Sequence, residues 1–111
     1  MPDPDGVGEG EYRECMDLVR FHLRVRDGRV AEARFQAYGC GPTIAAASAG
    51  TEVAAGRALD DLVTVRAAQI ERALGGLPEL RRHAAEVVAL GLRAAAQDAL
   101  AQARTRSEPN V

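Results

Sequence analysis

Hydrophobic and polar residues alternate strictly along the segment that starts at Asp17. The apolar positions are Val19, Phe21, Leu23 and Val25, and the polar positions between them are Arg20, His22, Arg24 and Arg26. A second alternation follows Asp27-Gly28, with Ala31, Ala33, Phe35 and Ala37 on its apolar side. A period of two is typical of a strand that buries one face. The sequence therefore predicts a β-hairpin from about Asp17 to Tyr38.

The apolar faces of the two strands decide their register. A plain two-residue turn at Asp27-Gly28 would place apolar residues of one strand opposite polar residues of the other. An odd-numbered loop or a β-bulge, with Gly28 in the left-handed conformation, removes this mismatch. We then expect Phe21 to lie opposite Phe35 or Ala33.

At the open end of the hairpin the same register brings three side chains together. Asp17 is expected opposite Ala37 or Gly39, and Cys15 lies two residues earlier on the same strand face. Cys40 directly follows Gly39. We therefore expect Cys15, Asp17 and Cys40 to converge at this end.

Helical patterns fill much of the remaining chain. Pro42 suits the first position of a helix that ends near Ala55. A short helical turn is expected at residues 60–61, and longer helices over 65–74 and 79–103. The chain thus predicts an α+β fold, in which a small antiparallel sheet built on the hairpin packs against several helices, including a long C-terminal helix.

The two ends of the chain lack an apolar period. Residues 1–12 are rich in Gly, Pro and acidic side chains, which predicts a mobile leader without secondary structure. Residues 105–111 predict a frayed tail. We expect one domain over residues 13–104, because a chain of 111 residues has room for a single core.

The charge pattern excludes several functions. All 14 basic residues are arginine, and 16 acidic residues bring the net charge to -2, so no basic field is present to attract nucleic acid. The absence of lysine removes Schiff-base catalysis and P-loop nucleotide hydrolysis. No segment has the roughly 20 apolar residues of a membrane-spanning helix, and we find no signal peptide. We expect a soluble cytoplasmic protein whose two cysteines stay reduced, as ligands or reactive thiols.

Cys40 and His83 have local features of metal ligands. Cys40 lies between two glycines just before a helix start, where the helix dipole favours the thiolate. His83 falls on the inward stripe of the last predicted helix, together with Val87, Leu90 and Ala94. Each residue alone also fits a structural role, Cys40 as a small buried hydrophobe and His83 as a hydrogen-bonded core histidine. Cys15 and Asp17 alone fit a solvated strand end.

Three segments of the chain carry a family resemblance. They are Cys15-Met16-Asp17, ARFQAYGCGPTIAAAS over residues 33–48, and LPELRRHA over residues 77–84. These segments resemble the IscU/NifU N-terminal family of iron-sulfur assembly scaffolds, and the similarity runs over residues 15–100. In such scaffolds three cysteines, an aspartate and a histidine surround a two-iron, two-sulfur cluster or a zinc ion. The resemblance implies that the matching ligands here are Cys15, Asp17, Cys40 and His83.

The same resemblance implies the cofactor and the partners. The cofactor is expected to be a 2Fe-2S cluster or iron, with zinc as an alternative. The partners are expected to be a cysteine desulfurase and acceptor apoproteins. The chaperone-binding Leu-Pro-Pro-Val-Lys of the family appears here as LPELR over residues 77–81, which leaves recognition by an Hsp70-type chaperone open.

The chain departs from the family pattern at Ala84. Where the family has His-Cys, this chain has His83-Ala84, so the third thiolate is missing. We expect the space at Ala84 to be shaped for a ligand. Two thiolates, a carboxylate and an imidazole still fill a tetrahedral zinc site or a mixed Cys/His cluster site.

Three functions follow from these residues. The first is a scaffold or carrier, not an enzyme, that accepts iron and sulfur and passes a cluster on. The second is a degenerate homologue that binds zinc or no metal and regulates an assembly complex by protein-protein contact. The third is a sulfur transferase that uses Cys40. It lacks a general base, since His22 lies on the polar strand face and His83 is assigned to the metal site.

Overall fold

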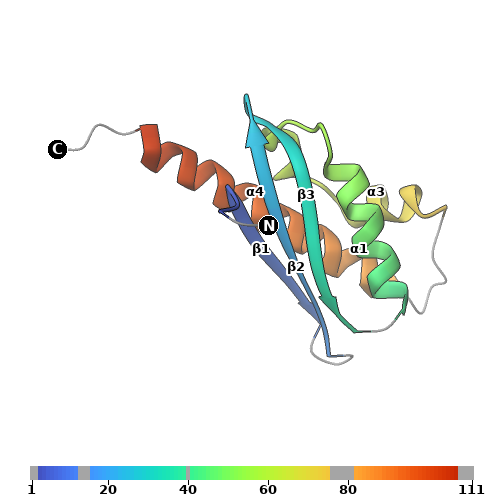
Figure 1. Cartoon of the computed structure of the whole chain (residues 1–111). Coiled ribbons are helices and arrows are strands. Elements are labelled where there is room, and N and C mark those ends of the chain that lie inside the picture. The colour runs from blue at the N-terminus through green and yellow to red at the C-terminus, as the bar shows by residue number, and fades with distance from the viewer. Residues whose placement is uncertain (1–2, 13–15, 40, 76–81, 108–111) are drawn as a thin grey trace.

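The computed structural model describes residues 3–12, 16–39, 41–75 and 82–107. Its elements, in chain order, are β1 (Gly6–Tyr12), β2 (Asp17–Arg26), β3 (Arg29–Tyr38), α1 (Gly41–Ala54), α2 (Leu59–Leu62), α3 (Ala67–Ala73) and α4 (Arg82–Ser107). The strands form one antiparallel sheet in the order β1-β2-β3. α4 runs along β1 and β2, and α1 lies beside β3 and α4, so that helices cover one face of the sheet (Figure 1). The predicted α+β fold with a long C-terminal helix is confirmed.

The hairpin has the register that its apolar faces predict. Phe21 pairs with Phe35, and their ring centroids lie 6.4 Å apart. Asp27 and Gly28 form a two-residue turn with φ values of 54° and 74°, the left-handed conformation that such a turn requires. A register shift at residues 24–25 restores the match between the apolar faces. Both the expected bulge and the left-handed Gly28 are confirmed.

The prediction of a leader without secondary structure is wrong for residues 6–12. These residues form β1, which pairs with β2 along its whole length. Gly6, Gly8 and Gly10 face α4, and a Cβ atom on any of them would overlap the backbone of the helix. The strand therefore packs its own backbone on the helix, which only glycine permits. Because glycine supplies no apolar side chain, this buried face leaves no hydrophobic alternation in the sequence.

The helices lie close to their predicted positions, but their ends differ. α3 starts at Ala67, later than predicted, and Val65 is buried in the core. α4 continues to Ser107, past the predicted end at Ala103 and into the expected frayed tail. Its predicted start at Glu79 lies outside the described residues. The core between sheet and helices includes Val19, Phe21, Leu23, Ala46, Ala47, Val88 and Leu92.

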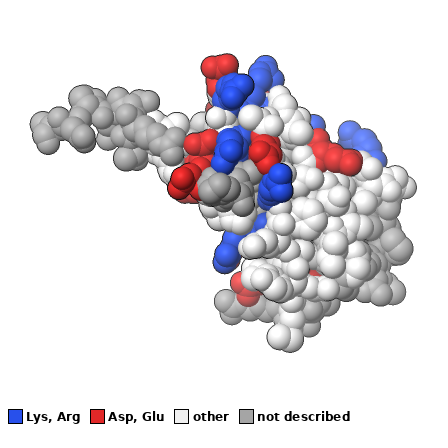
Figure 2. All heavy atoms as spheres, viewed as in Figure 1, with Lys and Arg blue, Asp and Glu red and all other residues white. Residues whose placement is uncertain are grey.

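The surface divides into a charged and an uncharged part. Figure 2 shows arginine and acidic side chains interspersed over the sheet, where Arg20 pairs with Glu9 and Arg34 with Glu32. The surface over α1 and the end of β3 is mostly uncharged (Figure 2), since residues 35–51 contain no charged side chain. Within the described ranges, no helix is long and apolar enough to cross a membrane.

Candidate metal centre

The centre starts from Asp17, a carboxylate at the first position of β2. Only 1% of Asp17 is exposed, and a buried carboxylate is costly unless it meets a cation or hydrogen-bond donors. Val19 pairs with Ala37, so Gly39 rather than Ala37 faces Asp17. A Cβ atom on Gly39 would overlap Oδ1 of Asp17. The residue that precedes Cys40 in the chain therefore lies directly against this carboxylate.

His83 reaches Asp17 from α4. Its Nε2 atom lies 3.1 Å from Oδ2 of Asp17, although 66 positions separate the two residues. The His83 side chain is 18% exposed, and the Asp17 side chain is fully buried. The structure thus brings together Asp17 and His83, the two candidate ligands that are not thiols.

A third side chain, Tyr12, completes the described part of the centre. Its ring stacks on the ring of His83, with centroids 4.7 Å apart and planes inclined by 23°. Sequence reasoning missed Tyr12, because the residue fell in the expected leader. The signal that could have found it is the G-x-G-x-G-x-Y pattern of residues 6–12, in which a large ring follows three glycines on one strand face.

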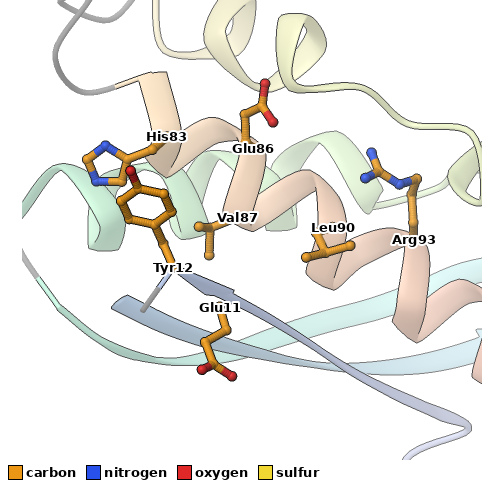
Figure 3. A pocket seen from close by; sticks show the side chains of 7 residues that line it. All are labelled: Glu11, Tyr12, His83, Glu86, Val87, Leu90 and Arg93. Atoms are coloured by element: carbon orange, nitrogen blue, oxygen red, sulfur yellow. The ribbon is translucent and has the colours of Figure 1, made fainter. Parts of the chain in front are cut away.

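A hollow of about 500 Å³ opens beside the stacked rings, between the end of β1 and α4 (Figure 3). Leu90 lines this hollow and is 45% exposed, so the prediction that it faces inward with His83 is wrong. Gly8 and Gly10 of β1 both lie against Gly91, and Gly10 also lies against Val87, which places Leu90 beside the sheet-facing line of α4. The lining residues are Glu11, Tyr12, His83, Glu86, Val87, Leu90 and Arg93.

The two predicted thiolate ligands, Cys15 and Cys40, lie outside the described residues, as does the segment 77–81. Their approach to one another stays a prediction. Among the residues that are described, no group of three or more His, Cys, Asp or Glu side chains could hold a metal ion. Ala84 is fully buried in the apolar core, so core packing fills the position where we expected a space for a ligand.

The second histidine, His22, belongs to the outer face of the sheet, as the alternation predicts. Burial lowers the pKa of His22 below its ordinary value, and the positive charge of Arg20 lowers it further. Nearby, the hydrogen bond from Arg34 lowers the pKa of Glu32. His22 lies five positions from Asp17 on the opposite face of β2, and it therefore provides an internal reference for His83.

Comparison with known proteins identifies relatives of the chain. A sequence model of the NifU-like N terminal domain matches residues 2–106. The iron-sulfur cluster assembly scaffold protein IscU 1 of Archaeoglobus fulgidus is 35% identical over 98 residues, and the match covers 88% of this chain and 64% of that protein. The iron-sulfur cluster assembly scaffold protein IscU of Azotobacter vinelandii is 35% identical over 98 residues, covering 86% of this chain and 76% of that protein. The chain thus spans about two thirds to three quarters of the length of these relatives.

A solved structure has the same fold. It is a putative iron-sulfur cluster assembly scaffold protein for the SUF system from Fervidobacterium islandicum, which superposes with a TM-score of 0.68 over 86% of this chain and 83% of that chain. At 16% identity this likeness concerns the fold alone. The match of the domain model over residues 2–106, together with the sequence relatives, shows that the chain belongs to the family of NifU-like N-terminal domains.

Proposed function

We propose that this chain is a scaffold or carrier in iron-sulfur cluster assembly, that it is not an enzyme, and that iron or a 2Fe-2S cluster is its cargo. The observation that carries the proposal is the contact between the buried Asp17 and the partly buried His83 at the open end of the hairpin. Cys15 stands two residues before Asp17, and Cys40 follows the glycine that lies against it. The relatives are named as iron-sulfur cluster assembly scaffold proteins, which supports the same role here.

The spacing of Asp17 and His83 suits a shared metal ion. Two ligand atoms on one tetrahedral ion, each at about 2.0–2.1 Å, lie about 3.3 Å apart. The Nε2 and Oδ2 atoms lie 3.1 Å apart, so a small movement lets both bind one ion. In the absence of an ion, the hydrogen bond between them satisfies Oδ2 of the buried carboxylate. Thiolates from Cys15 and Cys40 would complete a donor set that favours iron or zinc over magnesium or calcium.

Exposed apolar side chains near this centre support contact with protein partners. Met16 is 84% exposed, Tyr38 64% and Ile44 46%. Met16 directly precedes Asp17, and Tyr38 directly precedes Gly39. Ile44 lies near the start of α1. Each of these exposed apolar side chains is available for contact with a protein partner. In the proposed role these partners are a cysteine desulfurase, which supplies sulfur, and acceptor apoproteins, all in the cytoplasm.

A second candidate function is that of a degenerate homologue, which binds zinc or no metal and regulates an assembly complex by contact. The observation that favours it is Ala84, which is fully buried among apolar residues and cannot supply a third thiolate. Iron-sulfur clusters are commonly held by four cysteines, whereas mixed donor sets with two thiolates are ordinary for zinc. Loss of one thiolate therefore costs cluster binding more than zinc binding.

Anaerobic reconstitution tests the two candidates against each other. The purified protein is incubated with ferrous iron and sulfide, and absorption spectra and iron content are measured beside a zinc titration. Sulfide-to-iron charge-transfer bands, with iron bound in the ratio of a two-iron cluster, support the scaffold. Zinc binding without a cluster supports the degenerate homologue. A protein that takes up neither metal is not a scaffold for iron, and regulation by contact without a metal is then the remaining candidate.

Matched variants test whether the described residues hold the ion. His83→Gln removes the ring that faces Asp17, and His22→Gln removes the only other histidine of the chain. We expect His83→Gln and Asp17→Asn to bind zinc at least about 10-fold more weakly than wild type. His22→Gln should bind like wild type. Equal affinities in the two histidine variants would remove His83 from the site.

A further inference from the structure

We propose that Tyr12 is a positioning residue, which fixes the His83 ring toward Asp17; this inference rests on the proposed function and adds a residue to its site. Tyr12 is the last residue of β1, and its ring stacks on that of His83 at a centroid distance of 4.7 Å. Figure 3 shows Tyr12 extending from the strand and His83 from the start of α4, with the two rings side by side. The strand and the helix thus each contribute one ring to the contact.

The contact follows from the way in which β1 lies on α4. The inner positions of the strand are the even-numbered ones, because alternate residues share a face. Gly6, Gly8 and Gly10 lie in turn against residues 95–99, 91–95 and 87–91 of the helix. Two residues of the strand span about 6.8 Å, and four residues of the helix span about 6 Å. Every second strand residue therefore meets a new turn of the helix. The next step carries Tyr12 to the helical turn that holds His83.

The stack holds the His83 ring from a second side. At its edge, Nε2 faces the Asp17 carboxylate, and on one face it meets the Tyr12 ring. Without Tyr12, that face would open into the hollow of about 500 Å³, where other rotamers have room. A ligand side chain that is already ordered loses less entropy when it binds an ion. Tyr12 therefore raises metal affinity without touching the metal.

The proposed role depends on the ring of Tyr12, which makes the stack with His83. Tyr12→Phe keeps the aromatic face and should behave as wild type. Tyr12→Leu fills the space without a ring, and Tyr12→Ala removes both. Aromatic stacking is worth about 2- to 10-fold in an equilibrium constant, which sets the expected size of the loss. The leucine variant separates loss of stacking from loss of packing, should Tyr12→Ala fold poorly.

The first measurement uses the metal-free protein. The chain has two histidines, so comparison with His22→Gln assigns the His83 signals in NMR spectra. We expect the Hα-Hβ couplings of a single rotamer for His83 in wild type and Tyr12→Phe. In Tyr12→Leu and Tyr12→Ala we expect averaged couplings. Averaged couplings in wild type, or a single rotamer in both non-aromatic variants, would overturn the positioning role.

The second measurement titrates the same proteins with cobalt(II), whose ligand-field spectrum reports the geometry of its ligands. We expect Tyr12→Leu to bind cobalt about 2- to 10-fold more weakly than wild type, with shifted bands, and Tyr12→Phe to restore both. Leu90→Ala is the matched control, because Leu90 lines the same hollow, is 45% exposed and carries no ring. Wild-type affinity in Tyr12→Leu would overturn the inference. If wild type binds no cobalt, the proposed function fails, and the couplings alone decide whether Tyr12 orients His83.

Discussion

The α-carbon of Gly39 lies against the carboxylate of Asp17, so closely that a Cβ atom on Gly39 would overlap Oδ1. Gly39 also has a φ of 151°, which side chains other than glycine rarely adopt. The buried carboxylate and the chain that leads to Cys40 therefore share a space with no room for one more methyl group. This close contact fixes where the carboxylate can lie relative to His83.

Gly39→Ala is expected to lower the free energy of unfolding by about 1–3 kcal/mol and to weaken zinc binding, because the new methyl group must displace Asp17. Gly41→Ala is the matched control on the other side of Cys40, where an added Cβ would meet no further atom within 4 Å. Its stability should change by less than about 1 kcal/mol. Urea denaturation and a zinc titration measure the two effects. Equal results for both variants would contradict the close contact.

Gly10→Ala should separate β1 from α4. The added methyl group would overlap the carbonyl oxygen of Val87, and such overpacking costs about 1–3 kcal/mol or more. Glu9→Ala changes the neighbouring residue on the opposite face, where only an exposed ion pair with Arg20 is lost, and should cost less than about 1 kcal/mol. Urea denaturation compares the two variants. A Gly10→Ala protein as stable as Glu9→Ala would show that the strand and the helix are not in backbone contact.

Ala84→Cys restores a thiol at the position where the family pattern has one, and we expect it to increase cluster occupancy in anaerobic reconstitution. Since Ala84 is fully buried, the added sulfur should also lower stability by about 1 kcal/mol. Ala84→Ser, of similar size but without a thiolate, is the control. If only Ala84→Cys takes up a cluster, the natural protein is the degenerate homologue. Equal loading of wild type and Ala84→Cys would contradict the expected increase. A loss of loading in Ala84→Ser alone would then come from packing, because wild type lacks the thiolate as well.

Acid should destabilise the protein in part through His22. Burial lowers the pKa of folded His22 from its ordinary value of 6.5, so the unfolded chain binds the proton more readily. The contribution of neutral His22 is complete above pH 6.5 and is lost as the pH falls toward the folded pKa. The positive charge of Arg20 adds to the cost of a charged ring. Wild type should therefore lose stability relative to His22→Gln as the pH falls below about 6.5, as measured by denaturant unfolding. A difference that does not change with pH would contradict this assignment.

The hairpin could be predicted in detail because its information is local. The two alternations and the Asp27-Gly28 pair lie within 22 consecutive residues, and only one kind of register buries both apolar faces. That reasoning led to the pairing of Phe21 with Phe35 and to the bulge. It also singled out Asp17, whose burial at the end of the sheet follows from the same register.

The contact between Tyr12 and His83 was not predicted, because it depends on how α4 lies on the sheet. The close approach comes from three glycines, which carry no hydrophobic signal. The inward stripe of α4 was therefore misplaced, and Leu90 was assigned to the core although it is exposed. Tyr12 was missed for the same reason, since its contact with His83 exists only once the helix has been placed.

The packing of β1 on α4 makes the number of residues in the strand critical. Inserting one residue between Gly6 and Gly10 would exchange the two faces of part of the strand, driving a side chain such as Glu9 into the helix backbone or turning Tyr12 away from His83. Inserting two residues would keep the faces but shift Tyr12 by about 6.8 Å along the helix. This glycine-rich stretch has the composition of a linker, yet it should tolerate neither the gain nor the loss of a single residue.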